Sequence, residues 1–419
     1  MHGGTPLTGS INISGSKNAS LPILAATLLT EDTVIISRVP DVSDTNYMLQ
    51  ILSALGAEVE RSSGTVRIKC ANIVPDAPYE LVRRMRASIC VMGPLLSRLH
   101  RATVSLPGGC VIGDRPVDLH IKGLAALGAD CDVEGGNMDL KAPKGGLVGT
   151  TLDLRGKHGP TVLGTDNIMM AACLAKGTTV IESAACEPEV VDLANFLNSM
   201  GAKITGAGTR QITIEGVEKL HGTEHTVIAD RVEAGTFMAG AAAFSEGVTL
   251  NRVVEADLLP ATQVLRECGH KVEFTKNGTS VTVTPGENPI GAQITTTPHP
   301  GFPTDMQAQF TALFATTQGI SVIEDTIFPQ RFMHCAELSR MGAKISVDQG
   351  RAIVTGVDQL SGAPVMASDL RASAALVLAA LSAKGTTSIS RLYHIDRGYE
   401  HIDEKLLQLG ANVERVREK

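Results

Sequence analysis

Cys110 is the residue best placed for chemistry in this sequence, because it stands in a glycine-rich segment close to an arginine. The segment, residues 107–116, reads PGGCVIGDRP. Its three glycines predict a loop that leaves the thiol exposed, and Arg115 would favour the thiolate form. A thiol in this setting can act as a nucleophile or as a general acid. An exposed thiol without a function fits the pattern equally well.

Charged residues recur at the expected starts of six apolar helices. Each lies 35 to 42 residues before a glycine that ends a later helix. The six positions are Lys17, Arg86, Asp166, Arg231, Asp305 and Arg371. A charge at the start of a buried helix is costly unless it caps the helix, is paired or has a function. Aspartate complements the helix dipole there, whereas lysine and arginine oppose it. The four cations therefore favour a site that brings anions to helix N-termini.

Other motifs that carry chemistry are missing from the sequence. His394 and His401 flank Arg397, so a protease-like cysteine–histidine pair stays an alternative, although no hydrolase motif surrounds Cys110. Neither an HExxH motif nor a Cys/His cluster has the spacing of metal ligands, so we expect no metal and no cofactor. The phosphate-binding patterns GxGxxG and GxxxxGK[ST] do not occur, which argues against a doubly wound nucleotide-binding fold.

The elements that must position these residues form a sixfold repeat. The tripeptide Leu/Met-Gly-Ala occurs five times and Cys-Gly-His once, with glycines at positions 56, 128, 201, 269, 342 and 410. These glycines are 68 to 73 residues apart, so six copies account for the chain. In each copy an amphipathic helix is expected to end at the glycine, where a positive φ is favoured. A hairpin with alternating apolar and polar residues is expected to follow.

Each copy also contains a second helix that is apolar nearly all round, such as residues 307–315 and 371–383. A helix of this kind belongs in the interior of a protein. Six βαβαββ-like units of this composition predict an α/β fold with two inside-out domains. Each domain would hold three repeats, with the helices inside and the sheets outside. A solenoid is the alternative, but units this large with such apolar helices favour closed packing.

Length and composition agree with a soluble protein of two domains. The chain has 419 residues, of which 43% are hydrophobic and 19% charged, and one hydrophobic core rarely serves so many residues. The net charge of −7 argues against a nucleic-acid partner. No apolar run approaches the ~20 residues that span a bilayer, and the N-terminus does not resemble a signal peptide. Eight scattered cysteines indicate a reducing compartment, so we expect a cytoplasmic protein without a membrane partner.

Several long motifs resemble those of a known family. The segments GSKNASLPILAATLL, PGGCVIGDRPVDLH, PHPGFPTDMQAQF, SDLRASAALVLAAL and YHIDRGYEHID are similar to segments of the enolpyruvyl transferases that act on UDP-N-acetylglucosamine in bacterial cell-wall synthesis. The resemblance runs from about residue 3 to the end of the chain. It implies two inside-out α/β domains, the first with residues 1–16 and 226–419 and the second with residues 17–225.

The resemblance implies the activity and two reactive groups. Family members transfer the enolpyruvyl group of phosphoenolpyruvate to the 3′-hydroxyl of UDP-N-acetylglucosamine and release phosphate, by addition and then elimination. Cys110 matches the cysteine that donates the proton, forms a thioether adduct and is alkylated by fosfomycin. Asp305 matches the acid beside the sugar hydroxyl, which acts as a base or as a proton relay. The expected partners are therefore these two small-molecule substrates.

The resemblance also implies a set of substrate contacts. Guanidinium groups suit phosphate and carboxylate because they bind two oxygens at once. Lys17, Asn18, Arg115, Arg371 and Arg397 match the residues that contact phosphoenolpyruvate, and Arg331 is a weaker match. Lys17 and Arg397 are also expected to be catalytic, together with Cys110 and Asp305. The expected contacts with UDP-N-acetylglucosamine are Arg86, Arg115, Pro116, Val117, Asp118, Leu119, Asp305 and Ile327. Ordinary loop packing would explain Pro116, Val117 and Ile327 equally well.

The sequence departs from the family pattern at two places. Residues 155–164 form a longer loop of different composition, which puts the uridine contacts there in doubt, and Leu119 replaces a residue that is often polar. Two other functions remain alternatives. A shikimate-type enolpyruvyl transferase would accept shikimate 3-phosphate and would not need Cys110. A UDP-sugar sensor without turnover is the other alternative, which the presence of both Cys110 and Asp305 disfavours.

Overall fold

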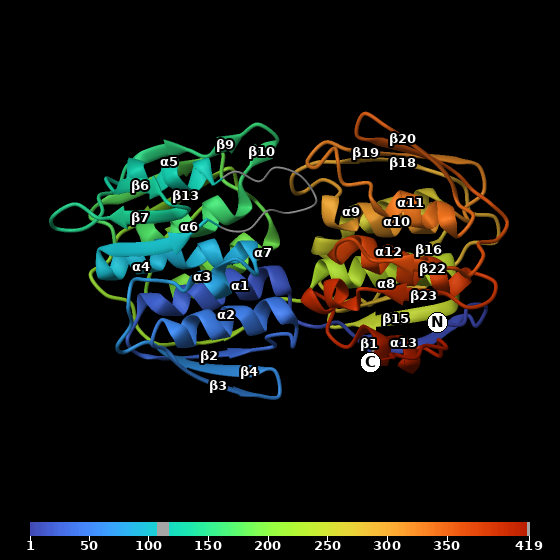
Figure 1. Ribbon diagram of the computed structural model, residues 1–419, viewed down its shortest axis with the longest axis horizontal. Helices are drawn as coiled ribbons and strands as arrows, with labels where there is room; N and C mark the ends of the chain where they lie inside the picture. The colour runs from blue at the N-terminus through green and yellow to red at the C-terminus, as the bar shows by residue number, and fades with distance from the viewer. Residues whose placement is uncertain (107–116, 417–419) are drawn as a thin grey trace. The chain divides into compact units, whose positions relative to one another are not determined.

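A computed structural model describes residues 1–106 and 117–416 (Figure 1). Cys110, Arg115 and Pro116 lie outside the described residues. The described chain forms two compact units, which we call the terminal unit (1–14 and 229–416) and the central unit (15–106 and 117–228). The chain passes between them after Ser14 and after Ile228, whereas the predicted domains divide after residues 16 and 225.

The central unit is built from three copies of the predicted repeat. Its helices are α1 (Lys17–Ala26), η1 (Thr27–Leu29), α2 (Ser43–Ala54), α3 (Tyr79–Val82), η2 (Arg86–Val91), α4 (Met92–Leu99), α5 (Asp118–Ala126), α6 (Val162–Ala172) and α7 (Pro188–Ser199). Its strands are β2 (Thr33–Ser37), β3 (Glu58–Ser62), β4 (Thr65–Lys69), β5 (Arg101–Ser105), β6 (Asp130–Glu134), β7 (Asn137–Lys141), β8 (Thr151–Asp153), β9 (Arg155–Gly156), β10 (Gly159–Pro160), β11 (Thr178–Glu182), β12 (Lys203–Thr205), β13 (Gln211–Glu215) and β14 (Glu224–Thr226).

The terminal unit has the same plan. Its helices are α8 (Arg231–Ala243), η3 (Glu255–Leu258), α9 (Leu259–Glu267), η4 (Thr304–Met306), α10 (Gln307–Phe314), α11 (His334–Arg340), α12 (Leu370–Ser382), η5 (Leu392–Arg397) and α13 (Ile402–Gln408). Its strands are β1 (Leu7–Asn12), β15 (Ser245–Asn251), β16 (Lys271–Phe274), β17 (Ser280–Thr284), β18 (Gln293–Thr296), β19 (Ile320–Asp325), β20 (Lys344–Asp348), β21 (Arg351–Thr355), β22 (Pro364–Met366) and β23 (Ser388–Ser390).

The apolar helices lie inside each unit, as the sequence predicted. Every residue of α10 is buried, and so is every residue of α12 except its last, Ser382. In the terminal unit α8, α10 and α12 pack against one another, and in the central unit α6 packs against both α1 and α4. In Figure 1 strands β2, β3 and β4 lie along one edge of the central unit, and β18, β19 and β20 lie along one edge of the terminal unit, with the helices on their inner side. This is the inside-out α/β arrangement with helices inside and sheets outside.

The sheets repeat one mixed pattern. In the sheet β1-β15-β17-β16, β1 runs parallel to β15, and β17 pairs antiparallel with both β15 and β16. The sheets β18-β19-β21-β20, β14-β2-β4-β3 and β8-β11-β13-β12 follow the same order. All six repeat glycines have a positive φ, between 88° and 102°. Each directly follows the C-cap residue of its helix, which confirms that the helices end at these glycines.

Two details differ from the predicted repeat. Asp166 is the fifth residue of α6 and not at its start, because Thr161 caps the helix with its side chain on the Gly164 N–H. In the sixth copy the described residues after Gly410, 411–416, form no hairpin, and a short antiparallel bridge joins Asn412 to His2. His2 also bridges Thr386, so the start of the chain takes up a strand position that the sixth copy leaves open.

Buried histidines give the fold a dependence on pH. Burial lowers the pKa of His270 to about 4. Burial, reinforced by Arg86, lowers the pKa of His120 to about 4. In His334 burial outweighs the opposing charge of Asp369, and the pKa is again about 4. The unfolded chain therefore binds more protons than the folded one between pH 6.5 and 4, so stability must fall as the pH falls through this range.

We expect His270→Gln to weaken this dependence. Between pH 7 and pH 5, protonation of one such histidine in the unfolded chain lowers the free energy of unfolding by about 2 kcal/mol. Urea unfolding of His270→Gln at the two pH values should show a drop smaller by this amount than that of the unchanged protein. His158→Gln, at an exposed position, is the control and should leave the drop unchanged. Equal drops for both variants would contradict the prediction.

Candidate active site

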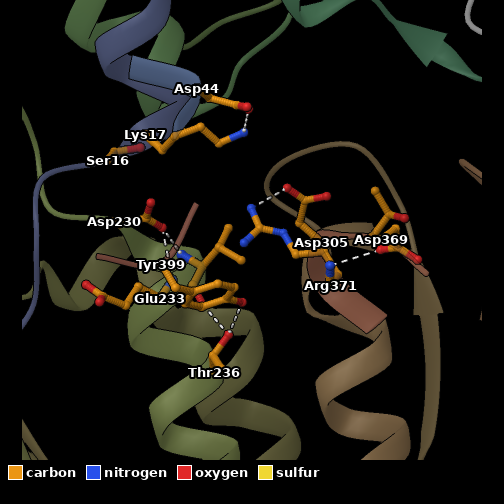
Figure 2. Close-up of polar contacts among 12 residues, drawn as sticks. Ser16, Lys17, Asp44, Asp230, Glu233, Thr236, Asp305, Asp369, Arg371 and Tyr399 are labelled. Atoms are coloured by element: carbon orange, nitrogen blue, oxygen red, sulfur yellow. Dashed lines mark hydrogen bonds and ion pairs between the residues drawn. The ribbon is translucent and has the colours of Figure 1, made fainter. Parts of the chain in front are cut away.

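A carboxylate held between two arginines is the centre of the site in the terminal unit; Figure 2 shows the carboxylate, Asp305, with one of the two, Arg371. Arg371 Nη2 lies 2.8 Å from Asp305 Oδ2, and Arg331 Nη1 lies 2.8 Å from Asp305 Oδ1. The side chains of Arg371 and Arg331 are 3% and 7% exposed, whereas Asp305 is 28% exposed. The two cations are therefore buried, while the carboxylate can reach a molecule in the solvent.

The electrostatics of Arg371 depend on this carboxylate. Burial alone lowers the pKa of the Arg371 guanidinium, but Asp305 opposes burial, and the net pKa is raised. Tyr399 adds to this environment, because its ring centroid lies 5.5 Å from the guanidinium carbon of Arg371. A cation over an aromatic face is stabilised by the ring quadrupole. Arg371 consequently stays charged at any physiological pH.

Helix starts position both partners of the Asp305–Arg371 pair. Asp305 is the middle residue of η4, which leads into α10. Arg371 is the second residue of α12, whose N-cap Asp369 accepts hydrogen bonds from the Arg371 and Ala372 N–H groups at 2.9 and 3.1 Å. The predicted placement of Asp305 and Arg371 at starts of buried helices is confirmed.

Arg331 and Ile327 lie on the loop that follows β19. Asp325 organises the start of this loop, because its Oδ1 accepts hydrogen bonds from the Ile327 and Phe328 N–H groups at 3.0 and 2.8 Å. Thr304 Oγ1 donates to the other oxygen of Asp325 at 2.6 Å, and Arg331 Nη1 also approaches Thr304 Oγ1 at 3.3 Å. The loop is thereby connected to the turn that carries Asp305.

Arg397 is the last residue of η5, in the segment between α12 and α13. The Gly398 and Tyr399 N–H groups both donate to the Ile395 carbonyl, at 3.1 and 3.0 Å, which closes the turn after Arg397. His394 lies in the same turn. Burial lowers the pKa of His394, and the positive charges of Arg397 and Arg391 act in the same direction.

Lys17 and Asn18 open the first buried helix of the central unit. Lys17 is the first residue of α1, and Ser16 caps the helix by accepting from the Ala19 N–H at 3.2 Å. Lys17 Nζ lies 3.4 Å from Asp44 Oδ2 (Figure 2), with exposures of 12% and 2%. A lysine opposes the dipole at this position, and Asp44 offsets this opposition.

Four further predicted contacts also belong to the central unit. Arg86 is the first residue of η2, and it is close enough to His120 to lower the pKa of that imidazole. Val117 is the N-cap residue of α5, and Asp118 and Leu119 form its first turn. Asp118 is exposed and Leu119 is half-buried. Within the described residues the structure thus brings Asp305, Arg331 and Arg371 into direct contact and places the other predicted residues at helix starts or loop turns.

The structure adds residues that sequence reasoning did not single out. Asp325 and Asp369 could have been found from their place just before a loop and a helix start, where aspartate accepts backbone hydrogen bonds. Gln309, Thr236 and Tyr399 carried no such local signal. Across residues 1–106 and 117–416, no group of three or more His, Cys, Asp and Glu side chains is arranged to hold a metal ion. In the same residues no helix is long and apolar enough to cross a membrane.

Comparison with known proteins gives consistent matches over the whole chain. The family model described as EPSP synthase (3-phosphoshikimate 1-carboxyvinyltransferase) matches residues 1–406. A UDP-N-acetylglucosamine 1-carboxyvinyltransferase of Akkermansia muciniphila is 68% identical over 416 residues, covering 99% of this chain and 98% of the relative. One from Methylacidiphilum infernorum is 57% identical over 415 residues, covering 99% and 97%.

Solved structures agree with these sequence matches. The enolpyruvyl transferase NikO from Streptomyces tendae superposes with a TM-score of 0.88 at 26% identity, covering 98% of this chain and 97% of that one. An EPSP synthase from Acinetobacter baumannii superposes with a TM-score of 0.76 at 19% identity, covering 99% and 98%. The second similarity concerns the fold alone.

Proposed function

The chain belongs to the EPSP synthase family, and from this premise we propose that it transfers the enolpyruvyl group of phosphoenolpyruvate to the 3′-hydroxyl of UDP-N-acetylglucosamine. Phosphate is the second product, and the reaction begins the synthesis of peptidoglycan precursors. The observation that carries the proposal is the 68% identity, over nearly the full length of both chains, with a relative named for this reaction. The partly exposed carboxylate of Asp305 between two buried guanidinium groups provides the acid that the reaction needs beside the sugar.

The proposed reaction has two steps. In the addition, the Cys110 thiol gives a proton to the methylene carbon of phosphoenolpyruvate, the sugar oxygen forms a bond to C2, and the hydroxyl proton passes to Asp305. In the elimination, the methyl group returns a proton to the Cys110 thiolate, the C2–C3 double bond forms again, and the C2–O bond to phosphate breaks with its electron pair on the phosphate oxygen. The released phosphate takes up the proton that Asp305 accepted, so both side chains return to their starting states. Lys17, Asn18, Arg115, Arg371 and Arg397 bind the phosphate and carboxylate groups, since charge-assisted hydrogen bonds to these anions are strong.

Arg371 and Arg331 have a second role in this scheme. Both contact the carboxylate directly at 2.8 Å, so they hold each oxygen of Asp305 in a fixed direction. Their positive charges stabilise the ionised carboxylate, which is the form that can accept a proton. Arg86, Arg115, Pro116, Val117, Asp118, Leu119 and Ile327 complete the proposed binding site for the UDP-sugar.

Three further expectations are part of the proposal. The two compact units correspond to two domains, divided close to residues 16 and 225. The enzyme works in the cytoplasm, which is supported by the seven cysteines of the described chain, since all of them are free. With a net charge of −7, it has no nucleic-acid partner.

Phosphate release tests the activity. The protein incubated with phosphoenolpyruvate and UDP-N-acetylglucosamine should release phosphate, and either substrate alone should give only background. Shikimate 3-phosphate in place of the UDP-sugar should give no release. Two features distinguish this chain from the shikimate-type enzymes: the presence of Cys110 and the high identity with relatives that are named for the reaction of the UDP-sugar. Release with shikimate 3-phosphate, or none with UDP-N-acetylglucosamine, would overturn the proposal.

A further inference from the structure

Three buried polar side chains form a hydrogen-bonded cluster at the site in the terminal unit, which we call the buried triad: Thr236, Gln309 and Tyr399. Thr236 Oγ1 lies 2.8 Å from the Tyr399 hydroxyl (Figure 2), and Gln309 Nε2 lies 3.0 Å from Thr236 Oγ1 and 3.1 Å from the Tyr399 hydroxyl. Their exposures are 1%, 0% and 2%. They come from α8, from α10 and from the segment after η5.

The donor and the acceptor of each hydrogen bond in the triad can be assigned. Thr236 Oγ1 donates to the Val232 carbonyl at 2.7 Å, so its hydrogen is already used. The Tyr399 hydroxyl must therefore donate to Thr236. Burial raises the pKa of Tyr399, which keeps this donor protonated. Gln309 has two hydrogens on Nε2, and one of them is directed at the two hydroxyl oxygens.

The second hydrogen of Gln309 reaches the catalytic turn. Gln309 Nε2 donates to the Asp305 carbonyl at 2.9 Å, so the amide joins the peptide of Asp305 to the two hydroxyls. The carboxylate of the same residue is fixed by Arg331 and Arg371. Asp305 is thus held at both ends, by the two arginines at its side chain and by the triad at its backbone.

Tyr399 connects the triad to the cations. Its ring lies against the guanidinium of Arg371, at 5.5 Å from centroid to carbon. Its backbone N–H closes the turn that ends at Arg397, two residues earlier. Tyr399 therefore joins the triad through its hydroxyl, contacts Arg371 through its ring and belongs to the turn of Arg397 through its backbone.

Packing alone does not require these groups. The interior faces of α8, α10 and α12 are otherwise built mainly from Ala, Leu, Val, Phe and Met. A buried hydroxyl or amide adds a desolvation cost to the fold unless its hydrogen bonds are made. Gln309 Oε1 has no hydrogen-bond partner among the described residues, so the triad carries part of this cost, while the bonds that Thr236, Gln309 and Tyr399 do make hold the three side chains in one arrangement. From the connection to Asp305 and Arg371, we propose that the buried triad is a positioning unit that orients these two residues for the transfer reaction. This inference rests on the proposed function.

Substitutions at Thr236 separate positioning from packing. Thr236→Val keeps the shape but removes the hydroxyl, and Thr236→Ser keeps the hydroxyl but removes a methyl group. If the triad positions Asp305, kcat for phosphate release should fall about tenfold in Thr236→Val, with KM for both substrates changed less than about twofold. Thr236→Ser should stay close to the unchanged protein. A packing role predicts the opposite order, with Thr236→Ser the more damaged variant because it leaves a cavity.

Tyr399→Phe provides a second and milder variant. It keeps the ring beside Arg371 but removes the donor to Thr236, so kcat should again fall about tenfold. The double variant Tyr399→Phe with Thr236→Val should be no slower than the slower single variant, because either change breaks the same chain of hydrogen bonds. Thr317→Val is the matched control: Thr317 is as buried as Thr236 and also donates to a carbonyl four residues earlier, at 3.0 Å, but lies near the far end of α10.

The outcomes distinguish this inference from the proposed function. No phosphate release by the unchanged protein would defeat the proposed function. Normal turnover by the unchanged protein together with kcat unaltered in Thr236→Val and Tyr399→Phe would defeat the positioning role alone. Equal losses in Thr236→Val and Thr317→Val would also defeat it, since they would indicate a general effect of losing a buried hydroxyl. Thermal unfolding of each variant shows whether it is folded at the assay temperature.

Discussion

Asp305→Asn is expected to lower phosphate release by a factor of about 10² to 10⁴, the usual contribution of a positioned acid or base. The asparagine amide has the shape of the carboxylate, but it has no charge and cannot accept the proton of the sugar hydroxyl. The substitution should mainly lower kcat, because the lost interaction is made in the transition state. Steady-state rates with both substrates varied measure this effect.

The same substitution should also destabilise the terminal unit. Arg371 and Arg331 would keep their buried positions but lose the counter-charge that both contact at 2.8 Å. Breaking a fully buried ion pair costs about 3–5 kcal/mol. Since Asp305 is 28% exposed, water screens part of the interaction, and we expect a loss of about 1–3 kcal/mol in the free energy of unfolding.

A control and a contradicting outcome accompany this prediction. Asp348→Asn, at the exposed end of β20, removes the same charge from the same unit and should change neither rate nor stability. More than a tenth of the original kcat in Asp305→Asn would contradict a role for this carboxylate in proton transfer. If Asp305→Asn loses activity but keeps its free energy of unfolding, the chemical role of Asp305 is confirmed. The same result would contradict the prediction that its charge stabilises the buried Arg331 and Arg371.

Cys110→Ser is expected to lower phosphate release by a similar factor, about 10² to 10⁴, because a serine hydroxyl is a far weaker acid than a thiol. Cys110→Asp should retain much more activity, since a carboxylic acid can donate a proton. Its rate should increase as the pH falls toward about 4, where an aspartate side chain becomes protonated. Neither variant has the thiol that a thioether with phosphoenolpyruvate requires.

The comparison of these two variants decides the role of the thiol. Loss of activity in both would indicate a nucleophile, whereas activity in Cys110→Asp alone indicates a general acid. Full activity in Cys110→Ser would instead favour a shikimate-type reaction. Cys131→Ser is the control, because burial, aided by Asp130, raises the pKa of the half-buried Cys131 to about 11 and makes it a poor thiolate.

The sequence allowed much of the fold to be predicted, because the repeat is a local signal. The six glycines marked the helix ends, and the apolar helices marked the interior of each unit, since both depend on residues a few positions apart. The sequence predicted Asp166 at the first position of its helix, whereas it is the fifth residue of α6. The reason is that Thr161 was not identified as the helix cap. The difference in the sixth copy, where residues 411–416 form no hairpin, was not foreseen, since the tripeptide at Gly410 is intact.

The site was predicted only in part, for a physical reason. Asp305 and Arg371 follow from the equivalent starts of buried helices, and Arg331 came from resemblance. The buried triad left no trace in the sequence, because Thr236 and Tyr399 are 163 residues apart. A buried Thr, Gln or Tyr shows a function only when its partner is known. Here the partners meet through the packing of α8, α10 and the segment after η5.

The order of the strands has a consequence for synthesis on the ribosome. β1 pairs in parallel with β15, whose first residue, Ser245, is 238 positions after Leu7, and at 5–20 residues per second β15 follows on the order of tens of seconds later. During this time the central unit can fold, because its strands are contiguous in the chain. Leu7, Ile11 and Ile13, each 1% exposed in the finished protein, meanwhile remain uncovered. The nascent chain therefore offers an apolar segment near its start to chaperones, or to other chains, until α8 and β15 emerge.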